Sequence, residues 1–102
     1  MVRIHIDHQG LKVFAVGHAE APRNEDGRDM VCCMVSTIVQ TLLISCQELP
    51  GVIVDNRMDP GDVYMHISAP DSQYIGVMHR MQMAEDGLRK LSEQYPNCVQ
   101  MF

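Results

Sequence analysis

Hydrophobic and polar residues alternate with a period of two in the first two segments of the chain, residues 2–8 and 11–17. Within each segment, valine, isoleucine, leucine or alanine recurs at every second position, which is the pattern of a half-buried strand. Gln9-Gly10 lies between the segments and has the composition of a tight turn. We therefore expect the two segments to pair as an antiparallel hairpin.

A helical period replaces this alternation after Asp29 and continues to Glu48. Asp29 is a favoured N-cap residue, and Pro50-Gly51 is a sequence that ends helices. Wound at about 100° per residue, the apolar side chains form one stripe, which consists of Val31, Val35, Ile38, Leu42, Cys46 and Leu49. We expect a helix of about twenty residues that packs this stripe against the sheet.

The second half of the chain repeats the order of two strands and a helix. Residues 52–54 begin a third strand, residues 63–68 alternate as a fourth, and Asp59-Pro60-Gly61-Asp62 between them is typical of a turn. Pro70-Asp71-Ser72 opens a second long helix, and residues 98–102 form a short edge strand. The expected apolar positions of this helix are Ile75, Met78, Met81 or Met83, Leu88 and Leu91, and Tyr95-Pro96-Asn97 ends it.

This order of elements predicts an α+β fold in a single domain over residues 1–102. The expected architecture is a two-layer sandwich, β-β-α-β-β-α, with both helices on one face of a mostly antiparallel sheet. Met78, Met81 and Met83 lie close together on the second helix, where they would fill the core or contact a second copy. His5 and His8 lie on the first hairpin, where we expect them to be solvated surface residues.

Composition and charge narrow the class of function. The net charge of −5 argues against direct binding to a phosphate backbone. The polar N-terminus is unlike a signal peptide, and we find no apolar run of the ~18 residues that a membrane helix needs. The four cysteines have no Cys-x-x-Cys spacing, which favours free thiols in a reducing compartment and no metal or other cofactor. We therefore expect a cytoplasmic protein, with Cys46 and Cys98 as small buried hydrophobes.

The candidate chemistry lies between the first hairpin and the first helix. Gly17-His18-Ala19 ends a strand, and Cys32 stands in the first helical turn with Ser36 one turn later. A base close to a thiol, with helix amides aimed at the sulfur, is what nucleophilic cysteine chemistry requires. Residues 19–28 between them carry five charged side chains. We expect this long loop to be mobile without substrate and to order over it.

From these residues alone, several interpretations stay open. His18 and Cys32 could be structural, or they could form a metal or redox site together with Cys33, or the chain could be a non-enzymatic dimeric binding module. Asp29 could oppose a thiolate, although capping the amides of Val31 or Cys32 is the better explanation. Ser36 could line a pocket or hydrogen-bond to a helix carbonyl.

The two motifs together resemble the ribosomal-processing cysteine protease family called Prp. The matching residues are Gly17, His18, Ala19, Gly27, Asp29, Met30, Val31, Cys32 and Ser36. The resemblance implies a homodimeric endopeptidase in which Cys32 is the nucleophile and His18 the base, with Gly17, Ala19, Gly27, Asp29 and Ser36 in supporting roles. Its implied substrate is the precursor of large-subunit ribosomal protein number twenty-seven, whose N-terminal extension is removed after an aromatic pair. Cys33 and Met34 depart from the family's small residues at these positions.

Overall fold

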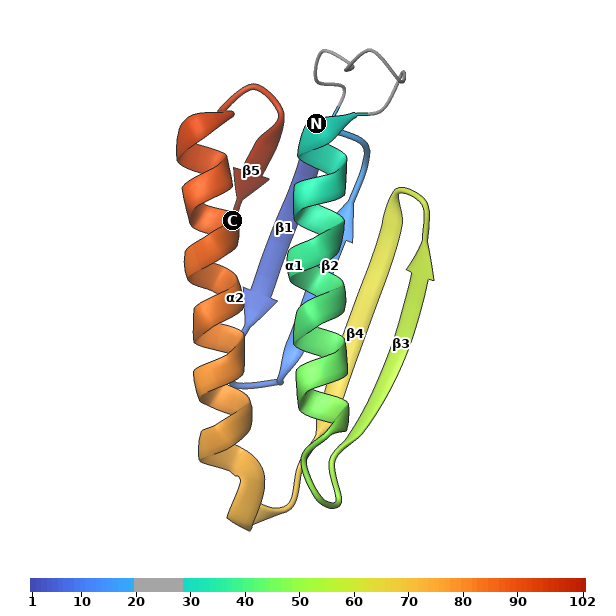
Figure 1. Cartoon of the computed structure of the whole chain (residues 1–102), viewed down its shortest axis with the longest axis vertical. Helices are drawn as coiled ribbons and strands as arrows, with labels where there is room; N and C mark the ends of the chain where they lie inside the picture. Colours follow the sequence, from blue (N-terminus) through green and yellow to red (C-terminus); the bar gives the residue numbers. More distant parts are fainter. Residues whose placement is uncertain (20–28) are drawn as a thin grey trace.

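The computed structural model describes residues 1–19 and 29–102. Its elements are β1 (Val2–Asp7), β2 (Lys12–Val16), α1 (Met30–Gln47), β3 (Ile53–Asp59), β4 (Asp62–Ser68), the 3₁₀ turn η1 (Asp71–Gln73), α2 (Tyr74–Gln94) and β5 (Val99–Met101). They follow the predicted order, including the short strand at the C-terminal end. Both helices lie side by side on one face of the sheet, which confirms the two-layer α+β architecture (Figure 1).

The five strands form one sheet in the order β3-β4-β2-β1-β5. Three of the four pairings are antiparallel, and the fourth joins β1 to β5 in parallel. The pairing of β2 with β4 matters most for the site. It aligns Val16 with Asp62 and so brings the end of β2 beside the turn between β3 and β4.

Both hairpin turns form where the sequence predicts them. In the first turn, the carboxylate of Asp7 accepts hydrogen bonds from the amides of Gln9 and Gly10, at 3.1 and 3.0 Å. The bond from Gly10 is the main reason that the pKa of Asp7 is lowered. In the second turn, Gly61 has a φ of +73°, a conformation that favours glycine.

The core lies between the sheet and one face of each helix. The buried residues of α1 are Val31, Val35, Val39, Leu42 and Cys46, and those of α2 are Val77, Met81, Ala84, Leu88 and Leu91. The predicted stripe of α1 is therefore largely confirmed, with Val39 buried and Ile38 and Leu49 only partly so.

One predicted apolar position of α2, Ile75, is wrong, and of the two alternatives Met81 and Met83 it is Met81 that is buried. Ile75 is 68% exposed and Met83 is 79% exposed. Ile75 lies two positions before the buried Val77, and Met83 lies two positions after the buried Met81. Side chains two positions apart on a helix point in directions about 200° apart. The buried stripe is set by Val77 and Met81, so Ile75 and Met83 face away from the sheet.

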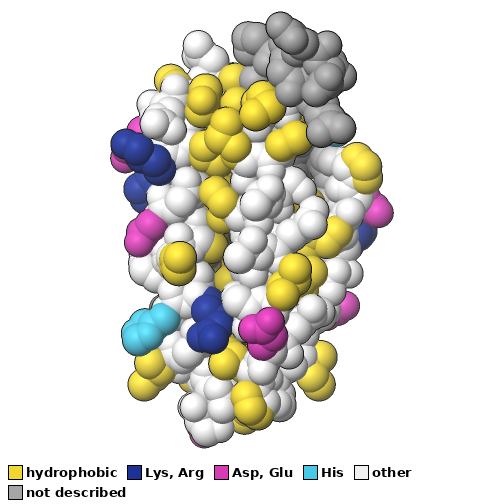
Figure 2. All heavy atoms as spheres, in the orientation of Figure 1, with side chains coloured by type: hydrophobic (Ala, Val, Ile, Leu, Met, Phe, Trp, Pro, Cys, Tyr) yellow, Lys and Arg dark blue, Asp and Glu magenta, His cyan; other side chains and the backbone are white. Residues whose placement is uncertain are grey.

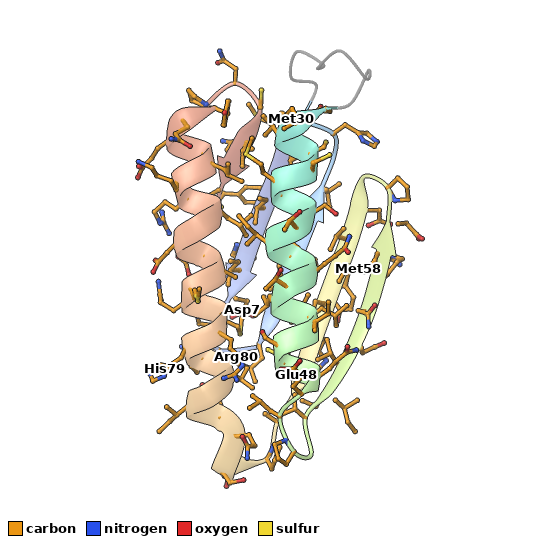
Figure 3. The ribbon with its side chains drawn as sticks, viewed as in Figure 1. Asp7, Met30, Glu48, Met58, His79 and Arg80 are labelled. Atoms are coloured by element: carbon orange, nitrogen blue, oxygen red, sulfur yellow. The ribbon has the colours of Figure 1, made fainter. Side chains whose placement is uncertain are left out.

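α1 contains no charged residue, and its 18 residues have a mean hydropathy of 1.7. By length and composition alone it could cross a membrane, contrary to the expectation from the sequence that the chain has no such run. Its packing gives another reason for this composition, because one side of the helix lies on the sheet and another contacts α2. Arg80 of α2 lies between the two helices (Figure 3) and donates from Nε to the carbonyl of Ser45. We assign α1 to the core of the domain.

The cysteines and histidines that the sequence places outside the site differ in burial. Cys46 is fully buried as expected, and desolvation raises the pKa of its thiol, whereas Cys98 is only partly buried against the core. His5 lies on the exposed sheet face and stacks on Phe14. His8 is partly buried and pairs with Glu85 of α2, an interaction that the sequence did not indicate.

Candidate active site

The end of β2 is shaped by Gly17. Its φ is +100°, and a Cβ at this position would overlap the carbonyl oxygen of Met1. Its amide donates to the carbonyl of Gly61 at 2.9 Å, which ties the chain to the turn between β3 and β4. Only glycine fits this combination of conformation and close approach. The chain therefore turns at Gly17 and delivers His18 to the β3–β4 turn.

The next residue, Ala19, connects the strand end to the helix. Its side chain is buried, and its amide donates a hydrogen bond to Sγ of Cys32 at 3.2 Å. The residue that follows the candidate base thus contacts the candidate nucleophile through its backbone. A donor at this position stabilises negative charge on the sulfur without depending on any side chain.

Asp29 caps α1, as predicted. Its backbone is extended, with φ −83° and ψ 104°, and its Oδ1 accepts from the amide of Cys32 at 3.0 Å. This bond places the carboxylate at the first helical turn and fixes the backbone from which the thiol projects. It also occupies the amide of Cys32, so that amide is not free to hold a developing oxyanion.

A cleft of about 360 Å³ opens between α1 and the β3–β4 hairpin. Cys32 and Ser36 lie on the helix wall, and His18 lies on the opposite side with the β3–β4 turn. The remaining lining residues are Val2, Ala15, Gly17, Val35, Val39, Gln40, Met58, Asp59, Pro60, Gly61 and Val63. Met58 extends from β3 toward α1 (Figure 3). The predicted nucleophile and base therefore share one cleft whose walls are mainly apolar.

Ser36 lines this cleft, which is one of its two predicted roles. Its hydroxyl accepts a hydrogen bond from the side-chain amide of Gln40 at 2.7 Å. Both residues lie on the helix wall one turn apart, so they place polar groups beside an otherwise apolar cavity.

His18 is exposed at the mouth of the cleft. Within the described residues it makes no hydrogen bond to Cys32, whose sulfur instead accepts from Ala19. The Nε2 edge of the imidazole lies against Gly61, because a Cβ there would come within 2.6 Å of that atom. The base and the thiol are therefore brought together in space without being hydrogen-bonded.

The other predicted site residues divide into two groups. Gly27 and the rest of the loop predicted to close over the substrate, residues 20–28, lie outside the described residues. Cys33 is exposed and does not line the cleft, since adjacent helical residues point about 100° apart. Across residues 1–19 and 29–102, no three His, Cys, Asp or Glu side chains gather as metal ligands would.

Sequence reasoning did not assign most of the cleft lining to the site, and Val39, Met58 and Gly61 are examples. The turn containing Gly61 was predicted, but its place beside His18 depends on the pairing of β2 with β4. That pairing joins strands distant in sequence, and no local pattern encodes it. Val39 could have been found from the helical wheel, since it lies four residues after Val35 and eight after Val31.

Comparisons with known proteins agree with this fold. Crystal structures of the essential ribosomal processing protease Prp from S. aureus are similar over most of both chains. The complex with a covalently linked product peptide has a TM-score of 0.78 at 21% identity, covering 98% of this chain and 94% of that one. The complex with a substrate peptide has a TM-score of 0.70 at 21% identity, with coverage of 99% and 95%.

SMU.848 from Streptococcus mutans has the same fold, with a TM-score of 0.71 and 24% identity, covering 98% of this chain and 89% of that one. No match among curated protein sequences was found. The family model described as cysteine protease Prp matches residues 1–100. The chain therefore belongs to the Prp family of cysteine proteases, and it is an enzyme that hydrolyses peptide bonds.

Proposed function

We propose that this chain is an endopeptidase that removes an N-terminal extension from a ribosomal protein, using Cys32 as nucleophile and His18 as general base. The observation that carries the proposal is that one apolar cleft contains both side chains, on facing elements. The substrate class rests on the S. aureus relatives, which are ribosomal processing proteases with bound peptides. The large-subunit ribosomal protein number twenty-seven is the proposed substrate.

In the proposed reaction, Sγ of Cys32 attacks the carbonyl carbon of the scissile bond while His18 takes the thiol proton. His18 then gives that proton to the leaving amine, and water hydrolyses the thioester with His18 again as base. The amide of Ala19, 3.2 Å from the sulfur, donates to Sγ and stabilises the negative charge that develops on it as the proton leaves.

The cleft supports a substrate segment with large apolar side chains. Val35, Val39, Met58 and Val63 form much of its lining, and charged groups are few. Hydrophobic side chains also gather on the surface around the N-terminal end of α1 (Figure 2). Burial of apolar surface supplies most of the binding energy for such a segment, at about 25 cal/mol per Å². These features fit cleavage after an aromatic pair.

The test of this function uses purified chain and the precursor of the proposed ribosomal protein. We expect a single cut that produces the mature N-terminus, identified by mass spectrometry of both products. Replacing the aromatic pair of the extension by serine should abolish the cut, because the apolar cleft then gains nothing from binding it. No cleavage of the intact precursor, or cleavage unaffected by the serine replacement, would reject this substrate.

The alternative of a non-enzymatic binding module loses its support, because the chain belongs to a protease family over residues 1–100. We place the reaction in the cytoplasm. The four cysteines are free, as expected in a reducing compartment where ribosomal proteins are made.

We also propose that the enzyme is a homodimer joined through the sheet face opposite the helices. Aromatic rings cross this face in register: His5 stacks between Phe14 and Phe102, and Phe14 contacts Tyr64 with centroids 5.2 Å apart. Phe102 is 67% exposed at the end of this row. An aromatic row on an open sheet is a surface that a partner would cover.

The charges flanking this row are self-complementary about a two-fold axis parallel to β2. Such an axis reverses the strand order, so β1 of one copy faces β4 of the other. Arg3 would then face Asp62, and Asp7 would face His66, because these residues occupy matching rows. Lys12 would meet its own copy, with Asp7 across from it on β1.

The dimer is tested at Phe14, which this axis places against its own copy. Phe14→Asp brings two carboxylates together, so we expect a mass near that of a dimer for the wild type and a monomer for the variant in sedimentation analysis. Met83→Asp is the control and should remain dimeric, because the Met83 side chain is exposed on α2, away from the proposed interface. A monomeric wild type, or an unchanged mass for Phe14→Asp, would contradict this interface.

A further inference from the structure

The turn between β3 and β4 lies against His18 at Gly61, a contact that no sequence pattern predicts. A Cβ built on Gly61 would lie 2.6 Å from Nε2 of His18, 2.9 Å from Cε1 and 3.2 Å from Cδ2. The first two distances are shorter than real Cβ contacts allow, so a Cβ at position 61 would force the exposed imidazole to turn away from its place. The imidazole therefore occupies the space that a side chain at position 61 would need.

We propose that Gly61 is a positioning residue for His18, and that it acts by having no side chain. This inference rests on the proposed role of His18 as general base. The exposed imidazole has no hydrogen-bond partner among the described residues, so contact with the turn is what defines its place at the cleft mouth. The bond from the Gly17 amide to the Gly61 carbonyl, at 2.9 Å, holds the two segments at this spacing.

Two requirements at position 61 must be separated in a test. Its φ of +73° disfavours most residues, and its neighbour His18 excludes a Cβ. Gly51 provides a matched control, because its φ is +74° and a Cβ there would meet only Pro70, at 3.3 Å. Gly51→Ala therefore carries a comparable backbone strain far from the imidazole. Gly61→Asn is the second variant, since asparagine tolerates this backbone region yet still brings a Cβ.

We expect kcat for precursor cleavage to fall at least about tenfold in Gly61→Ala and Gly61→Asn, with KM changed less than about threefold. A displacement of about 1 Å in a reacting group can cost 10²-fold. Gly51→Ala should cleave at nearly the wild-type rate. Iodoacetamide should alkylate Cys32 at an unchanged rate in both Gly61 variants, because the Ala19 amide still contacts the sulfur. In a His18→Ala background, adding Gly61→Ala should cause no further loss.

A second measurement does not depend on cleavage. In the wild type, we expect a nuclear Overhauser contact between the α-protons of Gly61 and the ring protons of His18. That contact and the ring chemical shifts should change in Gly61→Asn and stay as they are in Gly51→Ala. An absent contact in the wild type, or wild-type kcat in both Gly61 variants, would overturn the positioning role. Failure of the wild type to cut the precursor, with the contact present, would instead reject the proposed function alone.

Discussion

Replacing Cys32 by alanine should reduce precursor cleavage by roughly 10⁴–10⁶-fold, the scale on which nucleophile deletions act in other proteases. The sulfur lies in the same cleft as His18 and accepts the Ala19 amide, and no other described thiol lines that cleft. The rate is measured with the extended precursor, and the fold is checked by the melting temperature. Cys32→Ser keeps nearly the same shape and should be equally inactive, which separates loss of the nucleophile from loss of packing.

Cys33→Ala is the matched control for this prediction. Cys33 adjoins Cys32 in sequence but is exposed and points elsewhere on the helix, so the variant should retain most of the wild-type rate. An equal loss in both variants would contradict the assignment of Cys32. So would a Cys32→Ala variant that still cuts the precursor.

The sequence predicts those features of the fold that local patterns encode. The alternation around Ile4 and Val13 indicates the first hairpin, and Asp29 marks the start of α1 because its side chain caps the helix. Ile75 is misassigned because an apolar residue near a helix start satisfies a helical period without facing the core. Local chemistry fixes an element, whereas its buried side depends on what it packs against.

For the site, too, the sequence predicts what local motifs encode and not the contacts between distant segments. His18 and Cys32 are predicted from their motifs, because chemistry restricts the residue types at those positions, and both line one cleft in the structure. Their catalytic roles stay predictions. Two features escape, the donation from the Ala19 amide and the contact of His18 with Gly61. Both arise where segments distant in sequence meet, and both involve backbone or a missing side chain. A pattern of residue types carries no information about such contacts.

We expect loss of His18 to affect two reactions of Cys32 differently, namely alkylation by iodoacetamide and cleavage of the precursor. Its sulfur accepts a hydrogen bond from the Ala19 amide and none from His18. Removing the His18 side chain leaves that amide in place, so His18→Ala should change the rate of iodoacetamide alkylation by less than about threefold. Cleavage should nonetheless fall by 10²–10⁴-fold, because general acid–base catalysis typically contributes that much. The leaving amine needs a proton that a small electrophile does not.

Both rates are measured on one preparation, with alkylation at Cys32 followed by mass spectrometry of its peptide. Cys46 is an internal reference that should react slowly, since burial raises the pKa of its thiol. His79→Ala is the control for loss of an imidazole, because His79 points outward from α2 (Figure 3) and should change neither rate. If His18→Ala lowers alkylation as much as cleavage, the imidazole already activates the thiol in the free enzyme. The resting arrangement, in which the Ala19 amide and not His18 contacts the sulfur, would then be incorrect.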